Sequence, residues 1–219
     1  MQQPLEAVPL HDAVPQANGV VQQPAGAIAQ VAVQPAPPVT IYVASTLGHD
    51  LRQGEILSGV LQLDVNSDTD QYDTVVQPLA IVASQDCDLL WDYKERAAGR
   101  PGLSAILMLQ CGDAEPAREA AGLTSVPWKR VRQNESDRFH FLQAVEANAD
   151  AAGAGLPDML VDFRRIFTVS PAELYRQLAK PGGAQRRAVL VPPYREHLQN
   201  RVAFYLSRVG LPEPHSPAD

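Results

Sequence analysis

Two cysteines and a histidine are the residues of this 219-residue chain that best suit catalysis or metal binding. Cys87 stands between Asp86 and Asp88, directly after an apolar run that we expect to be a β-strand. Strand ends often carry functional side chains. Two adjacent carboxylates disfavour the thiolate and should raise the pKa of Cys87, so a nucleophile there would need a base or a metal. Cys87, Asp88 and His140 are therefore the candidate catalytic groups.

A zinc site is the second chemistry that these residues allow. Cys87, Cys111 and His140 would supply three ligands and leave an open position. Their separations of 24 and 29 residues are not diagnostic of such a site. In the alternative interpretation both cysteines are small buried side chains, and Asp86 and Asp88 cap the following turn or helix. The sequence thus predicts no obligatory cofactor and leaves zinc as an alternative.

Basic residues supply the candidate binding surface. They are Arg52, Lys129, Arg130, Arg132, Arg201 and Arg208. Such groups contact phosphates, and an exposed aromatic side chain such as Trp128, which precedes Lys129, stacks on bases. The acidic pI of about 5.2 disfavours a phosphate footprint over the whole domain. Salt pairing with acidic residues, or contact with a partner protein, explains the same cations.

The charges are unevenly distributed along the chain. Its net charge of −7 combines an acidic first half with a basic second half. Residues 41–119 hold 13 acids and 5 bases, a net −8, whereas residues 120–208 hold 8 acids and 13 bases, a net +5. This division predicts either two surfaces with different partners or two differently charged solvated faces.

The elements that must position these residues are mainly β-strands. Apolar or alternating runs predict strands over residues 39–43, 55–65, 74–84, 103–110, 138–145 and 160–169. In the fifth of these, Phe139 and Phe141 share one face, and His140 and Leu142 share the other.

Helix signals are fewer and lie mostly near the end of the chain. A short helix is possible over residues 114–121. Ser170 and Pro171 form a start signal for a helix that ends near Lys180. A last helix follows Pro193, and its predicted buried stripe is Leu198, Val202, Tyr205 and Val209.

Strands followed by helices predict an α+β domain. We expect a mostly antiparallel, SH3-like small β-barrel of about six strands with C-terminal helices, over residues 39–211. Residues 1–38 are rich in Pro, Gln and Ala, and this composition predicts a disordered N-terminal segment. Residues 212–219 predict a frayed tail.

A cytoplasmic location is the expectation for the chain. Its first residues contain no Lys or Arg and no apolar block, and no stretch approaches 18 apolar residues. Membrane contact is not expected, and the two cysteines should be reduced thiols.

One region resembles a known family. Gly54-Glu55-Ile56 and the run from Pro78 to Ser84 are similar to motifs of the PemK/MazF-like small β-barrels of toxin–antitoxin systems, over residues 52–84. The resemblance implies a small barrel and a toxin–antitoxin or phage-defence setting. The ribonucleases of that family carry an arginine before the proline, where this chain has Gln77. Glutamine cannot stabilise a developing phosphorane charge as a guanidinium does.

The expected function is a non-catalytic binding or regulatory module of a bacterial small-barrel type, contacting a partner protein or nucleic acid. The alternative is an enzyme, a hydrolase or nuclease, with a thiol or metal site around Cys87 and Asp88. A degenerate ribonuclease that uses Arg52 is a third possibility. The sequence has no Gly-rich phosphate loop, no Gly-x-Ser-x-Gly and no His-Glu-x-x-His, which weakens the commonest NTPase, hydrolase and metalloprotease interpretations.

Overall fold

A computed structural model describes residues 40–46 and 50–208, which contain seven strands and five α-helices. The strands are β1 (Tyr42–Ala44), β2 (Glu55–Asn66), β3 (Gln71–Val82), β4 (Ile106–Asp113), β5 (Phe139–Leu142), β6 (Met159–Val169) and β7 (Gln185–Leu190). The helices are α1 (Asp86–Ala97), α2 (Ala114–Ala120), α3 (Ser125–Arg132), α4 (Pro171–Ala179) and α5 (Tyr194–Ser207), with a 3₁₀ turn, η1, at Ala147–Ala149. The predicted α+β class is confirmed.

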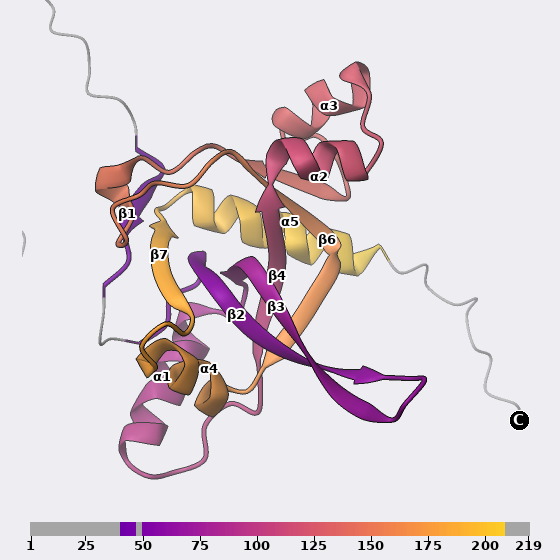
Figure 1. Cartoon of the computed structure of the whole chain (residues 1–219). Coiled ribbons are helices and arrows are strands. Elements are labelled where there is room, and N and C mark those ends of the chain that lie inside the picture. The colour runs from indigo at the N-terminus through magenta and orange to yellow at the C-terminus, as the bar shows by residue number, and fades with distance from the viewer. Residues whose placement is uncertain (1–39, 47–49, 209–219) are drawn as a thin grey trace, which may run out of the picture. The chain divides into compact units, whose positions relative to one another are not determined.

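All seven strands form one antiparallel sheet in the order β1-β7-β2-β3-β4-β6-β5 (Figure 1). The prediction of about six strands missed β7. Arg186 and Arg187 interrupt its apolar pattern, yet both charges are compensated inside the fold, by Glu55 and Asp150 respectively.

Closure of the sheet into a barrel is not confirmed. Among the described strands, β1 and β5 are the outermost and pair with one neighbour each. The two ends do approach one another, because the Tyr42 hydroxyl on β1 donates a hydrogen bond of 2.8 Å to the carbonyl oxygen of Gln143, just after β5. A side chain therefore links the two ends where a barrel would have a strand ladder.

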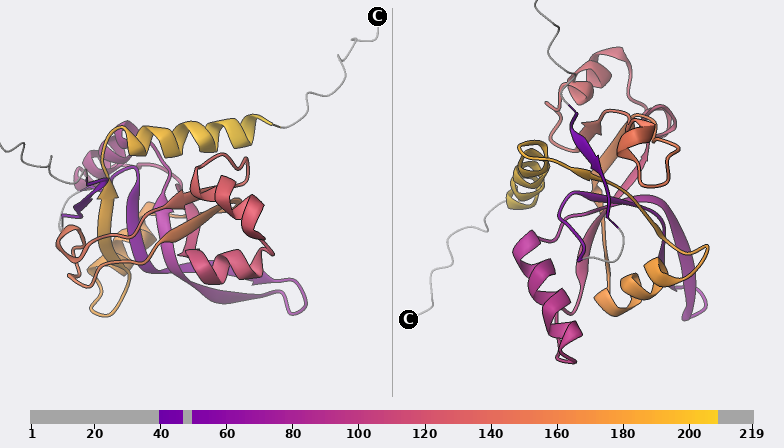
Figure 2. Two further views of the ribbon diagram at one scale, coloured as in Figure 1. Left: turned by 90° about the horizontal axis from the view of Figure 1, so that it is seen from above. Right: turned by 90° about the vertical axis from the view of Figure 1, so that its left-hand side faces the viewer.

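Alternate residues of the sheet enter different hydrophobic cores, because successive side chains point to opposite faces of a strand. Ile56 of β2 lies in the core shared with α5, and the next residue, Leu57, lies in the core shared with α1 and α4. Figure 2 shows α5 running along the sheet as a separate layer, where Leu198 and Val202 form its buried stripe as predicted.

A third, smaller core lies between β5 and the helices α2 and α3. Phe139 and Phe141 belong to it together with Trp128, whereas Leu142 belongs to the α5 core. The predicted two-faced pattern of β5 is thereby confirmed.

Three helices were predicted and are present: α2, α4 and α5, of which only α4 has a side-chain cap. The Ser170 side chain accepts a hydrogen bond of 3.3 Å from the Glu173 amide at the start of α4. α1 was not predicted as a helix because its two fully buried side chains are Leu89 and the charged Asp92, which give no apolar period. α3 was missed for a similar reason, since three of its eight residues are basic.

Several predictions lie outside the described residues. They are the disordered N-terminal segment at 1–38, the tail at 212–219 and the last position of the α5 stripe, Val209. No helix within residues 40–46 and 50–208 combines the length and the apolar character needed to cross a membrane.

Candidate functional site

The two cysteines have different environments. Cys87 is exposed in the first turn of α1, with its Sγ 3.6 Å from Gln85 Oε1 and 3.7 Å from Asp88 Oδ1. Cys111 is buried in β4, where burial, with a smaller contribution from Asp113, raises the pKa of its thiol to about 12. Cys111 therefore stays protonated at neutral pH and packs as an apolar side chain.

His140 is buried in β5 and is held in one tautomer. Arg201 donates a hydrogen bond of 3.2 Å to its Nδ1, so that nitrogen must be the acceptor and any proton lies on Nε2. Burial, and then the positive charges of Arg201 and His197, lower the pKa of His140 to about 3. The ring is thus neutral at physiological pH.

The structure does not bring the three proposed zinc ligands together. In the sheet, Cys111 and His140 both lie opposite Val161, one on each neighbouring strand, so their backbones are about 10 Å apart. Cys87 contacts neither and lies on α1. Among the described residues, no three histidine, cysteine or acidic side chains are grouped as metal ligands would be. The pairing of Cys87 with His140 is likewise not formed.

Asp86, rather than Asp88, is the engaged carboxylate at the start of α1. It accepts hydrogen bonds from the Gln53 amide (2.6 Å) and from Arg195 of α5 (2.5 Å), and Arg52 lies 3.7 Å from it. Asp88 is exposed. Arg52 therefore belongs to an ion-pair cluster that joins α1, α5 and the segment before β2.

Arg201 serves the fold. Its guanidinium donates to Asn134 Oδ1 (2.9 Å), to the carbonyl oxygens of Ser136 and Phe139, and to His140. These bonds fasten α5 to β5 and its preceding loop, and they leave little of the guanidinium for a ligand. Arg208, the other α5 candidate, is more exposed and lies 3.4 Å from Asp137.

The basic side chains of α3 do lie on the surface. Lys129, Arg130 and Arg132 are exposed, and Arg132 lies over the ring of Phe141 at 5.7 Å. Trp128, which was expected to stack on bases, is buried edge-on against Phe141. The α3 surface thus offers cations and no open aromatic platform.

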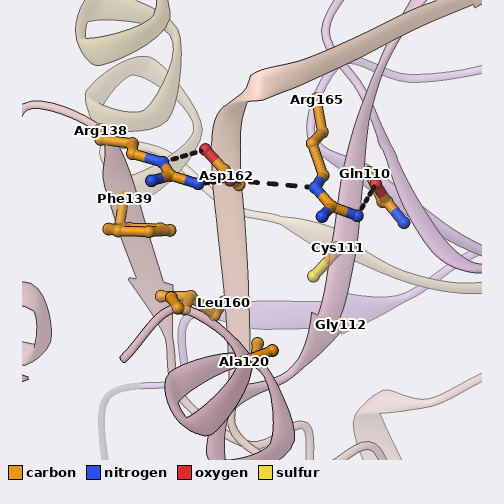
Figure 3. Close-up of a pocket in the computed structure, with 11 residues that line it drawn as sticks. Gln110, Cys111, Gly112, Ala120, Arg138, Phe139, Leu160, Asp162 and Arg165 are labelled. Atoms are coloured by element: carbon orange, nitrogen blue, oxygen red, sulfur yellow. Dashed lines mark hydrogen bonds and ion pairs between the residues drawn. The ribbon is translucent and has the colours of Figure 1, made fainter. Parts of the chain in front are cut away.

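A small pocket between β4, β5, β6 and α2 is lined by charged side chains that pair with one another (Figure 3). Asp162 accepts two hydrogen bonds from Arg138, at 2.6 and 2.9 Å, and lies 4.0 Å from Arg165, which also donates to Gln110. The walls include the apolar side chains of Phe139 and Leu160. Because the arginines are engaged with Asp162 and Gln110, we assign this pocket a structural role.

The most unusual surface is the outer half of the β2–β3 hairpin, residues 60–77, which we call the arm. β7 pairs with β2 only as far as Ser58, and β4 pairs with β3 only from Leu79 onward. The arm is therefore a two-stranded ribbon that extends beyond the sheet (Figure 1). At its base Gly59 has a φ of +69°, in the left-handed region that glycine tolerates, across from Pro78.

One face of the arm is apolar. Directly opposite residues of an antiparallel pair share a face, and one face carries the pairs Leu61–Val76, Leu63–Thr74 and Val65–Tyr72. Four of these side chains are highly exposed: Tyr72 (77%), Leu63 (68%), Val65 (57%) and Val76 (56%).

The opposite face and the turn of the arm are acidic. Asp64 and Asp73 lie opposite one another on the second face, and Asp68 and Asp70 lie at the turn. The arm has these four aspartates and no lysine or arginine. It is thus an amphipathic ribbon with one exposed apolar face and a negative one.

Comparison with protein-family models gives no match, and comparison with curated proteins gives none either.

The sequence predicted the two strands of the arm but not its role. The signal was present on the first strand only, where Leu61, Leu63 and Val65 alternate with polar residues. Alternation normally indicates a strand whose apolar face is buried and whose polar face is exposed to solvent. Only the sheet order shows that this face extends beyond the neighbouring strands. Its base, at Leu61, Leu63 and Thr74, borders a pocket shared with the end of β6 and the start of α4.

Proposed function

We propose that this domain is a non-catalytic protein-binding module and that the arm is its docking element. The observation that supports this proposal is the row of exposed side chains Leu63, Val65, Tyr72 and Val76 on a ribbon outside the main sheet. An isolated two-stranded ribbon is marginally stable by itself, and contiguous exposed apolar side chains are typical of interaction sites.

The charge of the arm favours a particular kind of partner. An apolar surface bordered by lysine or arginine side chains would cover the apolar face and compensate Asp64 and Asp73. Complementary charges of this kind increase association rates and select partners. A second copy of this chain would instead bring two sets of four aspartates together, and a nucleic acid would bring phosphates toward them.

The groups considered for catalysis are not brought together in this arrangement. His140 is held neutral against Arg201. Cys87 and Asp88 are exposed on α1, and His140 does not pair with Cys87. A small-barrel type of module in a toxin–antitoxin or phage-defence setting remains part of the proposal, and it depends on the resemblance over residues 52–84 alone.

Comparative affinity capture tests the proposal. Tagged wild-type chain is compared with Tyr72→Ser, on the apolar face, and Gln71→Ser, on the acidic face, in lysate of the source cells with and without nuclease. We expect a nuclease-resistant protein that is retained by wild type and Gln71→Ser and reduced at least ten-fold by Tyr72→Ser. Equal capture by all three, or loss on nuclease treatment, would contradict a protein-docking arm.

A further inference from the structure

The two outer edges of the arm differ in their backbone hydrogen bonding. On β2, the Leu61 amide donates to Gln177 Oε1 (2.8 Å), and Gln177 Nε2 donates to the Leu61 carbonyl oxygen (3.0 Å). The side-chain amide of Gln177 thus occupies the place of a neighbouring strand. Farther along this edge, the Val65 amide donates to Asp64 Oδ1 (2.9 Å).

The orientation of Leu61 also defines the other edge. The N–H and C=O of Leu61 point away from β3, so those of the directly opposite Val76 point away from β2. Every second residue of each strand has the same outward orientation. The outward backbone groups of β3 are therefore those of Tyr72, Thr74 and Val76. No hydrogen bond from any described residue reaches them.

Over residues 71–77 this β3 edge lacks several features that protect exposed strands, and a proline, Pro78, lies only at its base. Edge strands are commonly blocked by lysine, proline, a bulge or a covering element. Residues 71–77 contain no lysine and no proline, and β4 begins to pair only at Leu79. An open edge beside an exposed apolar face is the arrangement on which strand-addition recognition depends.

We infer that the partner adds an extended strand to the β3 edge, and that this strand alternates apolar with basic residues. This inference rests on the proposed function of the arm. Residues of the added strand opposite Tyr72, Thr74 and Val76 would extend the apolar face. The intervening residues would lie beside Gln71, Asp73 and Val75 on the second face, and a lysine or arginine beside Asp73 compensates its charge.

A synthetic peptide tests the edge directly. The probe is an eight-residue peptide of alternating valine and lysine, with a valine–glutamate peptide as the charge-reversed control. Amide hydrogen exchange of the full chain is followed by NMR. We expect the lysine peptide to slow exchange at least ten-fold at the amides of Tyr72, Thr74 and Val76 and not at Leu63, and the glutamate peptide to have no effect.

A matched pair of variants separates edge pairing from contact with the face. Thr74→Pro removes one outward N–H without removing a donor of the β2–β3 ladder, whereas Thr74→Val keeps the N–H in a good strand former. We expect Thr74→Pro to weaken peptide binding at least ten-fold and Thr74→Val to bind within two-fold of wild type. Circular dichroism and thermal melting verify that both variants are folded.

Three results would overturn the inference: equal binding by Thr74→Pro and wild type, peptide binding that leaves these amides unprotected, or no binding of the lysine peptide. If the captured cellular protein is nevertheless lost in Tyr72→Ser but kept in Thr74→Pro, docking uses the face alone and the proposed function stands. If sedimentation shows that the arm mediates self-association, the occupant is a second copy and both the inference and the proposed partner are wrong.

Discussion

His140 and Arg201 form one unit at the level of single residues. The neutral imidazole accepts from the guanidinium, which also holds three oxygen atoms of the loop before β5 and of its first residue. Two residues considered for catalysis and ligand binding thus connect α5 to the sheet. The fold therefore requires a charged Arg201 and a neutral His140, and two predictions follow from this requirement.

The first prediction concerns acid stability. The folded-state pKa of His140, about 3, lies below the ordinary value of 6.5, so the unfolded chain binds more protons between these values. Stability from this group is complete above about pH 6.5 and decreases as the pH falls toward 3, by at most about 1.4 kcal/mol per pH unit. The free energy of unfolding, measured with urea, should change less between pH 7 and pH 5 in His140→Gln than in wild type. An unchanged difference would contradict the assignment.

The second prediction compares the two arginines of α5. Arg201→Ala removes several hydrogen bonds and leaves carbonyl groups unsatisfied, so we expect a loss of about 3 kcal/mol in unfolding free energy. Arg208→Ala, the matched control, removes one exposed ion pair and should cost less than about 0.5 kcal/mol. Similar costs measured by chemical denaturation would mean that Arg201 does not serve as a structural clamp.

At the level of elements, Gln177 is what distinguishes the two edges of the arm. Its side chain makes a two-point contact with Leu61 that resembles a strand ladder, and its Nε2 also contacts Glu173 within α4. α4 thereby determines which edge stays open.

Removing this contact should expose the β2 edge. We expect Gln177→Ala to lower the unfolding free energy by about 1–2 kcal/mol and to speed amide exchange at Leu61. Gln185→Ala, an exposed glutamine at the start of β7, is the control and should leave both quantities nearly unchanged. Protection of the Leu61 amide that persists in Gln177→Ala would show that another group covers this edge.

The sequence allowed prediction of elements wherever a period or cap was strong. Such a pattern is present in β2, β5, β6, α4 and α5, and β1 and β4 were predicted from short apolar runs. β7 and α1 were missed because each buries a charged residue. Arg186 pairs with Glu55, which is far away in the chain, and Asp92 pairs with Arg96 of the same helix and accepts from the Leu103 amide. The pairing of Arg186 depends on residues far apart in the chain, so a local pattern cannot reveal it.

The candidate site was harder to predict than the fold. Unusual residue types drew attention to Cys87 and His140, whereas the arm consists of ordinary alternating strand residues. Its distinctive property is the absence of covering elements among the described residues, which depends on where β4, β7 and α4 end. That property exists only in the assembled sheet.

At the scale of the whole domain, part of the charge asymmetry of the sequence is compensated within the fold. Basic residues of the second half pair with acidic residues of the first, as Arg186 does with Glu55 and Arg195 with Asp86. The acidic arm has no such compensation, since none of its aspartates forms an ion pair with a described residue. The uncompensated charge thus lies beside the uncovered apolar face.

Photo-crosslinking from adjacent positions of the arm tests this account most directly. A photoreactive phenylalanine analogue replaces Tyr72 on the apolar face in one protein and Gln71 on the acidic face in another, and both are irradiated in the source cells. We expect a discrete protein adduct from position 72, attached to a segment that alternates apolar and basic residues, and at least ten-fold less from position 71. Equal yields from both positions, or adducts only with nucleic acid, would contradict it.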